Sequence, residues 1–119
     1  MLNQCSLIGR LGADPEVRYT QDGLMITSFR IATSEKFKDK EYTEWHKIIT
    51  FKKLAEICGN YLKKGSLVYI AGRIQTRSWD DKEGVKRYTT EIMANTMKML
   101  DGRKAEEKDS YEVDDNIPF

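Results

Sequence analysis

The sequence predicts a small all-β barrel that carries one helix. Three stretches, residues 25–33, 43–51 and 66–79, alternate their side chains with the period-two spacing of strands. Only residues 53–62 place apolar side chains at helical spacing. The chain has 119 residues, of which 39% are hydrophobic and 33% charged, and this suits one domain with a small core.

The first strand is predicted at residues 2–12, where side chains of the two faces alternate. Pro15 marks a turn, after which residues 17–19 continue the strand. Gly9 and Gly12 lack side chains and therefore indicate a bulge or a close approach of another part of the chain.

Met25–Thr33 is the predicted second strand, in which Phe29 and Ile31 are candidates for the core. The following segment, Ser34–Tyr42, has no apolar face, and we expect an exposed, mobile hairpin loop there. Phe37, in the middle of this loop, lies among three lysines: Lys36, Lys38 and Lys40.

Thr43–Phe51 is the predicted third strand, because six of its nine residues are β-branched or aromatic. One face carries two rings with a cation between them, since it presents Trp45, Lys47, Ile49 and Phe51. The other face presents His46, Ile48 and Thr50. Two interpretations fit the first face: a core strand whose lysine reaches solvent, or a platform on which bases stack while a cation meets phosphate.

One helix is predicted at Lys53–Leu62, where apolar residues form a single stripe: Leu54, Ile57, Cys58, Tyr61 and Leu62. We expect Lys63 and Lys64 in its last turn, where the helix dipole favours cations. Gly65 is the expected stop.

Ser66–Trp79 is a long predicted strand, followed by a hairpin turn at Asp80–Gly84 and a last strand at Val85–Leu100. Three strands, one helix between the third and fourth, and a long hairpin favour an OB-fold, a five-stranded Greek-key barrel. We therefore assign residues 1–100 to one domain. Residues 101–119 are charged and short of large aliphatic side chains, and we expect a short disordered linker with an acidic tip.

Charge is divided unevenly along the chain. Residues 1–104 hold 19 Lys and Arg against 13 Asp and Glu, a net of +6, whereas residues 105–119 hold one Lys against six acidic residues, a net of −5. A basic body predicts an anionic ligand, and a short acidic tail predicts a separate role. No apolar run reaches the length of a membrane span, so we expect a cytoplasmic protein that binds no membrane.

No catalytic, metal or cofactor site is predicted. The single histidine, His46, lies inside a strand, where a packed or interface side chain is a better interpretation than a general base. Cys5 and Cys58 are too few for a disulfide framework and, with one histidine, for a zinc site. The GRLG segment at residues 9–12 lacks the Lys-Ser/Thr of a phosphate-binding loop.

Aromatic side chains interleave with cations at three places: around Phe37, around Trp45 and Phe51, and at Trp79, which shares strand parity with Arg73 and Arg77. Base stacking tolerates any sequence, and Lys and Arg contacts to phosphate add a salt-dependent term. The pattern therefore predicts binding of single-stranded nucleic acid without strong sequence preference. Burial in the core is the alternative for each single ring.

The segments LIGRLGADPEVRY, SFRIATSE, TEWHKIITFKKLAE, YLKKGSLVYIAGRIQTR, YTTEI and the terminal DDNIPF resemble the bacterial-type single-stranded DNA-binding proteins. The resemblance covers residues 1–100 in order, and the tip matches independently. It implies a homotetrameric OB-fold with no enzymatic activity and no cofactor. The stacking positions it implies are Phe37, Trp45, Phe51 and Trp79, and the backbone-contacting positions are Lys47, Lys53, Lys64 and Arg77, to which parity adds Arg73.

In this family the tip binds replication, recombination and repair enzymes, so the resemblance assigns that role to Asp114, Asp115, Ile117, Pro118 and Phe119. The chain departs from the family pattern at Phe37, where many members have Trp, and at Asn116, where an Asp is frequent. Its linker is short, which indicates a phage, plasmid or compact-genome member. Two other functions fit the residues less well: a protein–protein adaptor on a primosome-like OB scaffold, and an RNA-preferring OB module.

Overall fold

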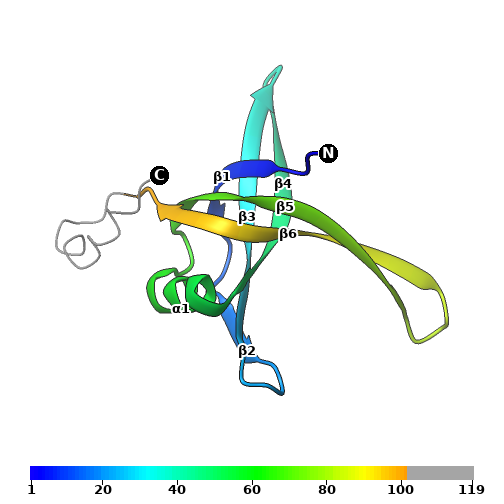
Figure 1. The fold of residues 1–119 in the computed structure, drawn as a ribbon. Coiled ribbons are helices and arrows are strands. Elements are labelled where there is room, and N and C mark those ends of the chain that lie inside the picture. The colour runs from blue at the N-terminus through cyan, green and yellow to red at the C-terminus, as the bar shows by residue number, and fades with distance from the viewer. Residues whose placement is uncertain (102–119) are drawn as a thin grey trace.

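The computed structural model describes residues 1–101, in which six strands and one helix form a barrel (Figure 1). The elements are β1 Cys5–Leu11, β2 Glu16–Tyr19, β3 Met25–Phe37, β4 Lys40–Phe51, α1 Lys52–Tyr61, β5 Leu67–Asp80 and β6 Lys86–Met99. The strand order is β1-β5-β6-β4-β3-β2, and an additional pairing of β1 with β3 closes the barrel. The β4–β6 pair is parallel, and every other pair is antiparallel.

This architecture confirms the predicted five-stranded OB-type barrel. The helix lies in the predicted place, after the strand that ends at Phe51. The segment after Pro15, which the sequence predicted to continue the first strand, is a separate short strand, because β2 pairs with the start of β3 and with no other strand of the described chain.

The core lies between the strands and the helix, and it includes both core candidates of the predicted second strand, Phe29 and Ile31. Ile31, Ile48, Val68 and Ile70 are fully buried, and Phe29 is nearly so. The remaining members of the buried cluster are Leu11, Cys58, Leu62 and Ile92. Burial of these side chains provides the main stabilising contribution to the barrel.

Helix α1 covers one end of the barrel and packs chiefly on β3 and β4 (Figure 1). The Thr27 hydroxyl donates a hydrogen bond of 2.8 Å to the carbonyl of Ala55, which fastens the helix to β3. The helix ends at Tyr61, so the expectation that Lys63 and Lys64 occupy its last turn is wrong; both follow the helix in the loop to β5.

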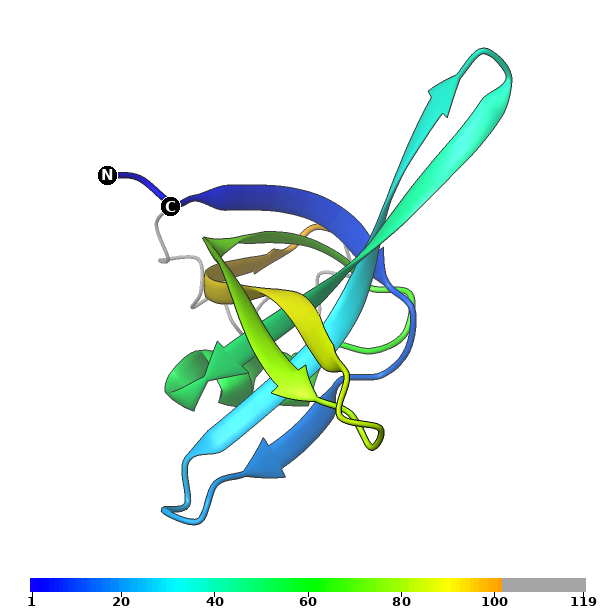
Figure 2. The same ribbon diagram turned by 90° about the vertical axis from the view of Figure 1, so that its right-hand side faces the viewer.

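Two hairpins extend beyond the barrel as arms, β3–β4 and β5–β6 (Figures 1 and 2). The prediction of a loop at Ser34–Tyr42 is wrong, because β3 continues to Phe37 and β4 begins at Lys40. Only Lys38 and Asp39 form the turn, with φ of 52° and 68°. Both faces of the arm are exposed, so its strands pair without the apolar face that identifies a strand in sequence.

The turn of the second arm is organised by Asp81. Its Oδ1 accepts hydrogen bonds of 2.9 Å from the backbone N–H groups of Glu83 and Val85, and its Oδ2 accepts one of 2.9 Å from Arg87 Nε. This confirms the predicted hairpin turn. These three bonds lower the pKa of Asp81, with the backbone of Val85 and the Arg87 side chain as the largest causes.

In the part of the chain that the structure describes, no helix is long and apolar enough to cross a membrane.

Candidate nucleic-acid interface

One continuous strand face collects most of the predicted binding residues. Strand β6 lies between β4 and β5, and Lys47 is paired with Glu91, which is in turn paired with Gln75. Because paired residues point to the same side of a sheet and alternate along each strand, the following residues share this side: Trp45, Lys47 and Phe51 of β4, Glu91 of β6, and Arg73, Arg77 and Trp79 of β5. We call this surface the β4–β6–β5 face.

Trp45 lies where β4 leaves the barrel and enters the first arm. It is 52% exposed, although Ile48, three residues later, is fully buried. Its ring lies against Gly12, in the segment that follows β1: a Cβ on Gly12 would come within 2.6 Å of Trp45 Cζ3. The ring is thus supported by the chain on one side and open to solvent on the other.

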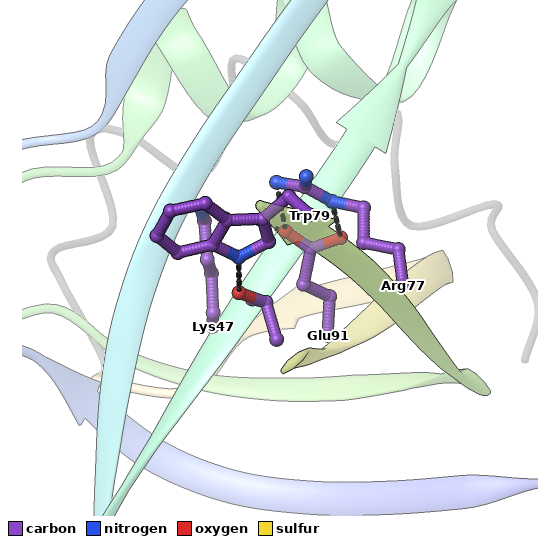
Figure 3. Close-up of polar contacts among 5 residues, drawn as sticks. Lys47, Arg77, Trp79 and Glu91 are labelled. Atoms are coloured by element: carbon purple, nitrogen blue, oxygen red, sulfur yellow. Dashed lines mark hydrogen bonds and ion pairs between the residues drawn. The ribbon is translucent and has the colours of Figure 1, made fainter. Parts of the chain in front are cut away.

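Trp79 lies on the second arm and is 45% exposed. Its indole Nε1 donates a hydrogen bond of 3.0 Å to the hydroxyl of Thr89 on the neighbouring strand (Figure 3). This bond satisfies the only donor of the ring and fixes its orientation. The ring face therefore remains available for stacking.

Between the two tryptophans lies an ion cluster. Arg77 Nε and Nη2 donate to the two carboxylate oxygens of Glu91 at 3.3 and 3.2 Å, and Lys47 Nζ lies 3.5 Å from Glu91 Oε2 (Figure 3). The Glu91 side chain is only 5% exposed, whereas those of Lys47 and Arg77 are 28% and 52% exposed. Both cations can therefore reach a phosphate from the solvent side.

The other predicted cations differ in position. Arg73 lies on the β4–β6–β5 face, and its Nη1 donates to Gln75 Oε1 at 2.9 Å. Lys53 is exposed in the first turn of α1. Lys64 is exposed in the loop after α1, and its backbone N–H donates to Asp14 Oδ1 at 2.9 Å. The structure therefore places Lys53 and Lys64 outside the three strands that carry the cluster, one in α1 and one in the loop that follows it.

The two predicted phenylalanines also differ. Phe51 is the last residue of β4, has the strand parity of Trp45 and is partly buried. Phe37 pairs with Lys40 at the tip of the first arm, so it has the opposite parity to Trp45. Its ring is exposed, and Lys38 Nζ lies 5.4 Å from the ring centroid, within the range of a cation–π contact.

Arg30 and Glu91, which are both paired with Lys47, are absent from the sequence prediction. Arg30 is exposed on β3, directly opposite Lys47 and between the buried Phe29 and Ile31. The alternation of Met25–Thr33 could have identified it, because a cation between two core residues must point outward. Glu91 has no such signal, because its role depends on the parallel pairing of β4 with β6.

His46 and Cys58 are the two groups of the described residues that the sequence analysis considered for a reactive role and whose surroundings the structure now shows. His46 is half-buried, and its Nε2 lies 2.9 Å from the Thr33 hydroxyl, which fits the packed interpretation. Burial raises the pKa of the Cys58 thiol to about 12, so this group is not a nucleophile near neutral pH. No group of three metal-ligating side chains occurs among residues 1–101. The tip residues lie outside the described residues: Asp114, Asp115, Ile117, Pro118 and Phe119.

Comparison with known proteins gives consistent results. The profile of the "Single-strand binding protein family" matches residues 2–100. "Single-stranded DNA-binding protein 1" of Xylella fastidiosa is 53% identical over 109 residues, which cover 87% of this chain and 79% of that protein. A "Single-stranded DNA-binding protein" of Neisseria meningitidis serogroup A is 54% identical over 107 residues, or 86% of this chain and 62% of that protein.

A solved structure described as "Plasmodium falciparum SSB complex with ssDNA" superposes with a TM-score of 0.80 at 31% identity. The match covers 85% of this chain and 96% of that one.

Proposed function

Because the chain belongs to the single-strand binding protein family, we propose that it binds single-stranded DNA on the β4–β6–β5 face without strong sequence preference. The observation that carries the proposal is the arrangement of this face. Two half-exposed tryptophans, Trp45 and Trp79, flank a cluster whose two cations, Lys47 and Arg77, reach solvent.

The chemistry of this face favours an unpaired strand. Indole rings can stack on bases only where the bases are unstacked, and a duplex keeps its bases inside. Stacking accepts every base, and the cations contact phosphates, which carry no sequence information. In this proposal Trp45 and Trp79 provide the main stacking, with Phe51 and Phe37 at the margins, while Arg73, Lys53 and Lys64 extend the phosphate contacts.

A fluorescence titration tests the proposal. Oligo(dT) at low salt should quench the emission of Trp45 and Trp79, and the affinity should fall as salt increases. Matched oligo(rU) and a DNA duplex of the same length are the comparisons. Unchanged emission with oligo(dT) would refute the proposal, and tighter binding of oligo(rU) would favour an RNA module.

We also propose that the chain assembles as a homotetramer. Strand β1 pairs with β3 at only two residues, Arg10 and Leu11, so most of one edge of β1 lacks a pairing partner in the described chain. Ile8, near the centre of this strand, is 56% exposed. An open strand edge beside an exposed apolar side chain favours association with another copy. Light scattering with and without oligo(dT) measures the assembly and its ligand together.

The tip is proposed to recruit replication, recombination and repair proteins, with Ile117, Pro118 and Phe119 entering an apolar and basic pocket of the partner. Asp114 and Asp115 would add electrostatic attraction. Deletion of residues 116–119 should leave oligo(dT) binding unchanged and abolish partner binding. Recruitment by the truncated chain would refute this role.

In this proposal the protein acts by binding and requires neither catalysis nor a cofactor. Protection of single strands would place it with cellular DNA, in the bacterial cytoplasm at the nucleoid or in the host cytoplasm for a phage-encoded chain.

A further inference from the structure

A nearly buried carboxylate lies in the middle of a surface that should attract phosphate. Strand β6 is flanked by β4 and β5, so Glu91 is adjacent to Lys47 on one side and within reach of Arg77 on the other (Figure 3). The Glu91 side chain is 5% exposed, whereas those of Lys47 and Arg77 are 28% and 52% exposed.

The charges of this cluster do not balance. One carboxylate is shared by two cations, so the local charge is +1 instead of the +2 that Lys47 and Arg77 would have without Glu91. The carboxylate uses only part of the donor capacity of its partners. Arg77 donates with Nε and Nη2, and an arginine has five N–H groups, so donors remain for a phosphate on the exposed side.

This inference rests on the proposed binding of single-stranded DNA. We propose that Glu91 limits the affinity of the β4–β6–β5 face for phosphate by neutralising half of the charge of Lys47 and Arg77. A phosphate that contacts either cation must lie within a Debye length of the Glu91 carboxylate, which is about 8 Å at physiological ionic strength. The carboxylate therefore repels every phosphate that these two cations bind, and it lowers the affinity of the complex.

A different role for Glu91 would change the affinity for oligo(dT) in the opposite direction when the carboxylate is neutralised. If Glu91 served mainly to hold Lys47 and Arg77 in the geometry that phosphate requires, its neutralisation would release the cations and weaken binding. Arg77 is 52% exposed although its Nε and Nη2 both donate to Glu91, so the remaining N–H groups of its guanidinium are available to a phosphate. The sign of the change in affinity therefore separates the two roles.

Glu91→Gln tests the proposal, because it keeps the shape of the side chain and removes its charge. Binding of oligo(dT) to the full chain should tighten by about threefold to a hundredfold, the range that the Coulomb energy of charges about 6 Å apart spans between the dielectric constants of bulk water and of a protein surface. One further effective cation should steepen the slope of log affinity against log salt by about 0.7. Glu16→Gln is the matched control, because Glu16 is exposed on β2, three strands from β6 in the sheet order, and its affinity should stay near that of the unmodified chain.

A second series keeps the test decisive if Glu91→Gln alone disturbs folding. The cluster has a local charge of zero in Arg77→Gln, +1 in the unmodified chain, +1 in the double variant Arg77→Gln with Glu91→Gln, and +2 in Glu91→Gln. The affinity should follow this order, so the double variant should recover most of what Arg77→Gln loses. Circular dichroism and light scattering check the fold and assembly of each variant.

Tighter binding by Glu91→Gln, or recovery in the double variant, supports the proposal. Weaker or unchanged binding by a folded Glu91→Gln overturns it, as does a double variant no better than Arg77→Gln. An unmodified chain that leaves oligo(dT) unbound refutes the proposed function, whereas a normal chain with an inert Glu91→Gln refutes this inference alone.

Discussion

The ring of Trp45 lies directly against Gly12, and a Cβ at that glycine would come within 2.6 Å of Cζ3 and 2.7 Å of Cη2. The two residues lie far apart in sequence, and the contact joins the segment after β1 to the start of the first arm. Gly12 therefore determines where the half-exposed ring of Trp45 can lie. This contact makes Gly12 a positioning residue for the proposed stacking platform.

Gly12→Ala should displace the Trp45 ring with little loss of stability, because the contact is with the far end of a side chain that can rotate. We expect a shift in tryptophan emission of the free protein and weaker binding of oligo(dT), by up to the stacking energy of one base, roughly 1–3 kcal/mol. The control is the same change in a Trp45→Ala background, where it should no longer affect binding. An equal loss in both backgrounds would contradict the positioning role.

Trp45→Ala should weaken oligo(dT) binding by roughly 1–3 kcal/mol, because it removes one stacking surface while the barrel core is untouched. Phe37→Ala is the comparison, since Phe37 is also exposed but has the opposite parity on the arm. The smaller loss should occur at Phe37. Fluorescence of Trp79 reports binding by both variants, and light scattering should show unchanged assembly. A larger loss of affinity in Phe37→Ala would contradict this prediction and indicate that the main stacking site lies at the tip of the arm.

Asp81→Asn should loosen the turn of the second arm at neutral pH, because the carboxylate accepts three hydrogen bonds there. The pKa of Asp81 is lowered from its ordinary value of 3.8, so its contribution to stability is present above that value and is lost as the pH falls through the lowered pKa. The difference in Tm between the variant and the unmodified chain should therefore be largest near neutral pH and shrink in acid. A difference that grows in acid would contradict the assignment.

Cys58 should be inert to thiol reagents in the folded protein. It is fully buried in α1, and burial raises its pKa to about 12 against the smaller opposing effect of a hydrogen bond with Thr50. A Cys5→Ser variant leaves Cys58 as the only thiol, and mass spectrometry should find no label at mildly alkaline pH until denaturant is added. Rapid labelling without denaturant would show that the helix opens locally.

Side-chain alternation predicted the barrel strands, and the two core candidates that it identified, Phe29 and Ile31, are buried. It could not predict the outer part of the first arm, where both faces are exposed. The expected close approach at the N-terminal glycines is confirmed: a Cβ at Gly9 would lie 2.4 Å from the carbonyl oxygen of Ala32.

The sequence could predict which candidate binding residues share a face of one strand, but not which strands lie side by side. Parity placed Trp45 with Lys47 and Trp79 with Arg77, and the structure shows that these two pairs share one face. The link between them is the parallel pairing of β4 with β6, a contact between segments about 44 residues apart that no local pattern contains. For the same reason the sequence did not predict that Glu91, an acidic residue in a Thr-rich strand, contacts Lys47 and Arg77.

The turn of the first arm provides a last prediction. Lys38 and Asp39 both have positive φ, as the two central positions of a type I′ hairpin turn require, although lysine is uncommon in that region. Lys38→Asn combined with Asp39→Gly supplies the residues that such a turn prefers and should raise the free energy of unfolding by about 1 kcal/mol, measured by denaturant titration. Gly23→Ala, at a φ of 86° in the β2–β3 turn, is the opposite control and should destabilise the protein. A free energy of unfolding that stays unchanged or falls in the double variant would contradict this account of the turn.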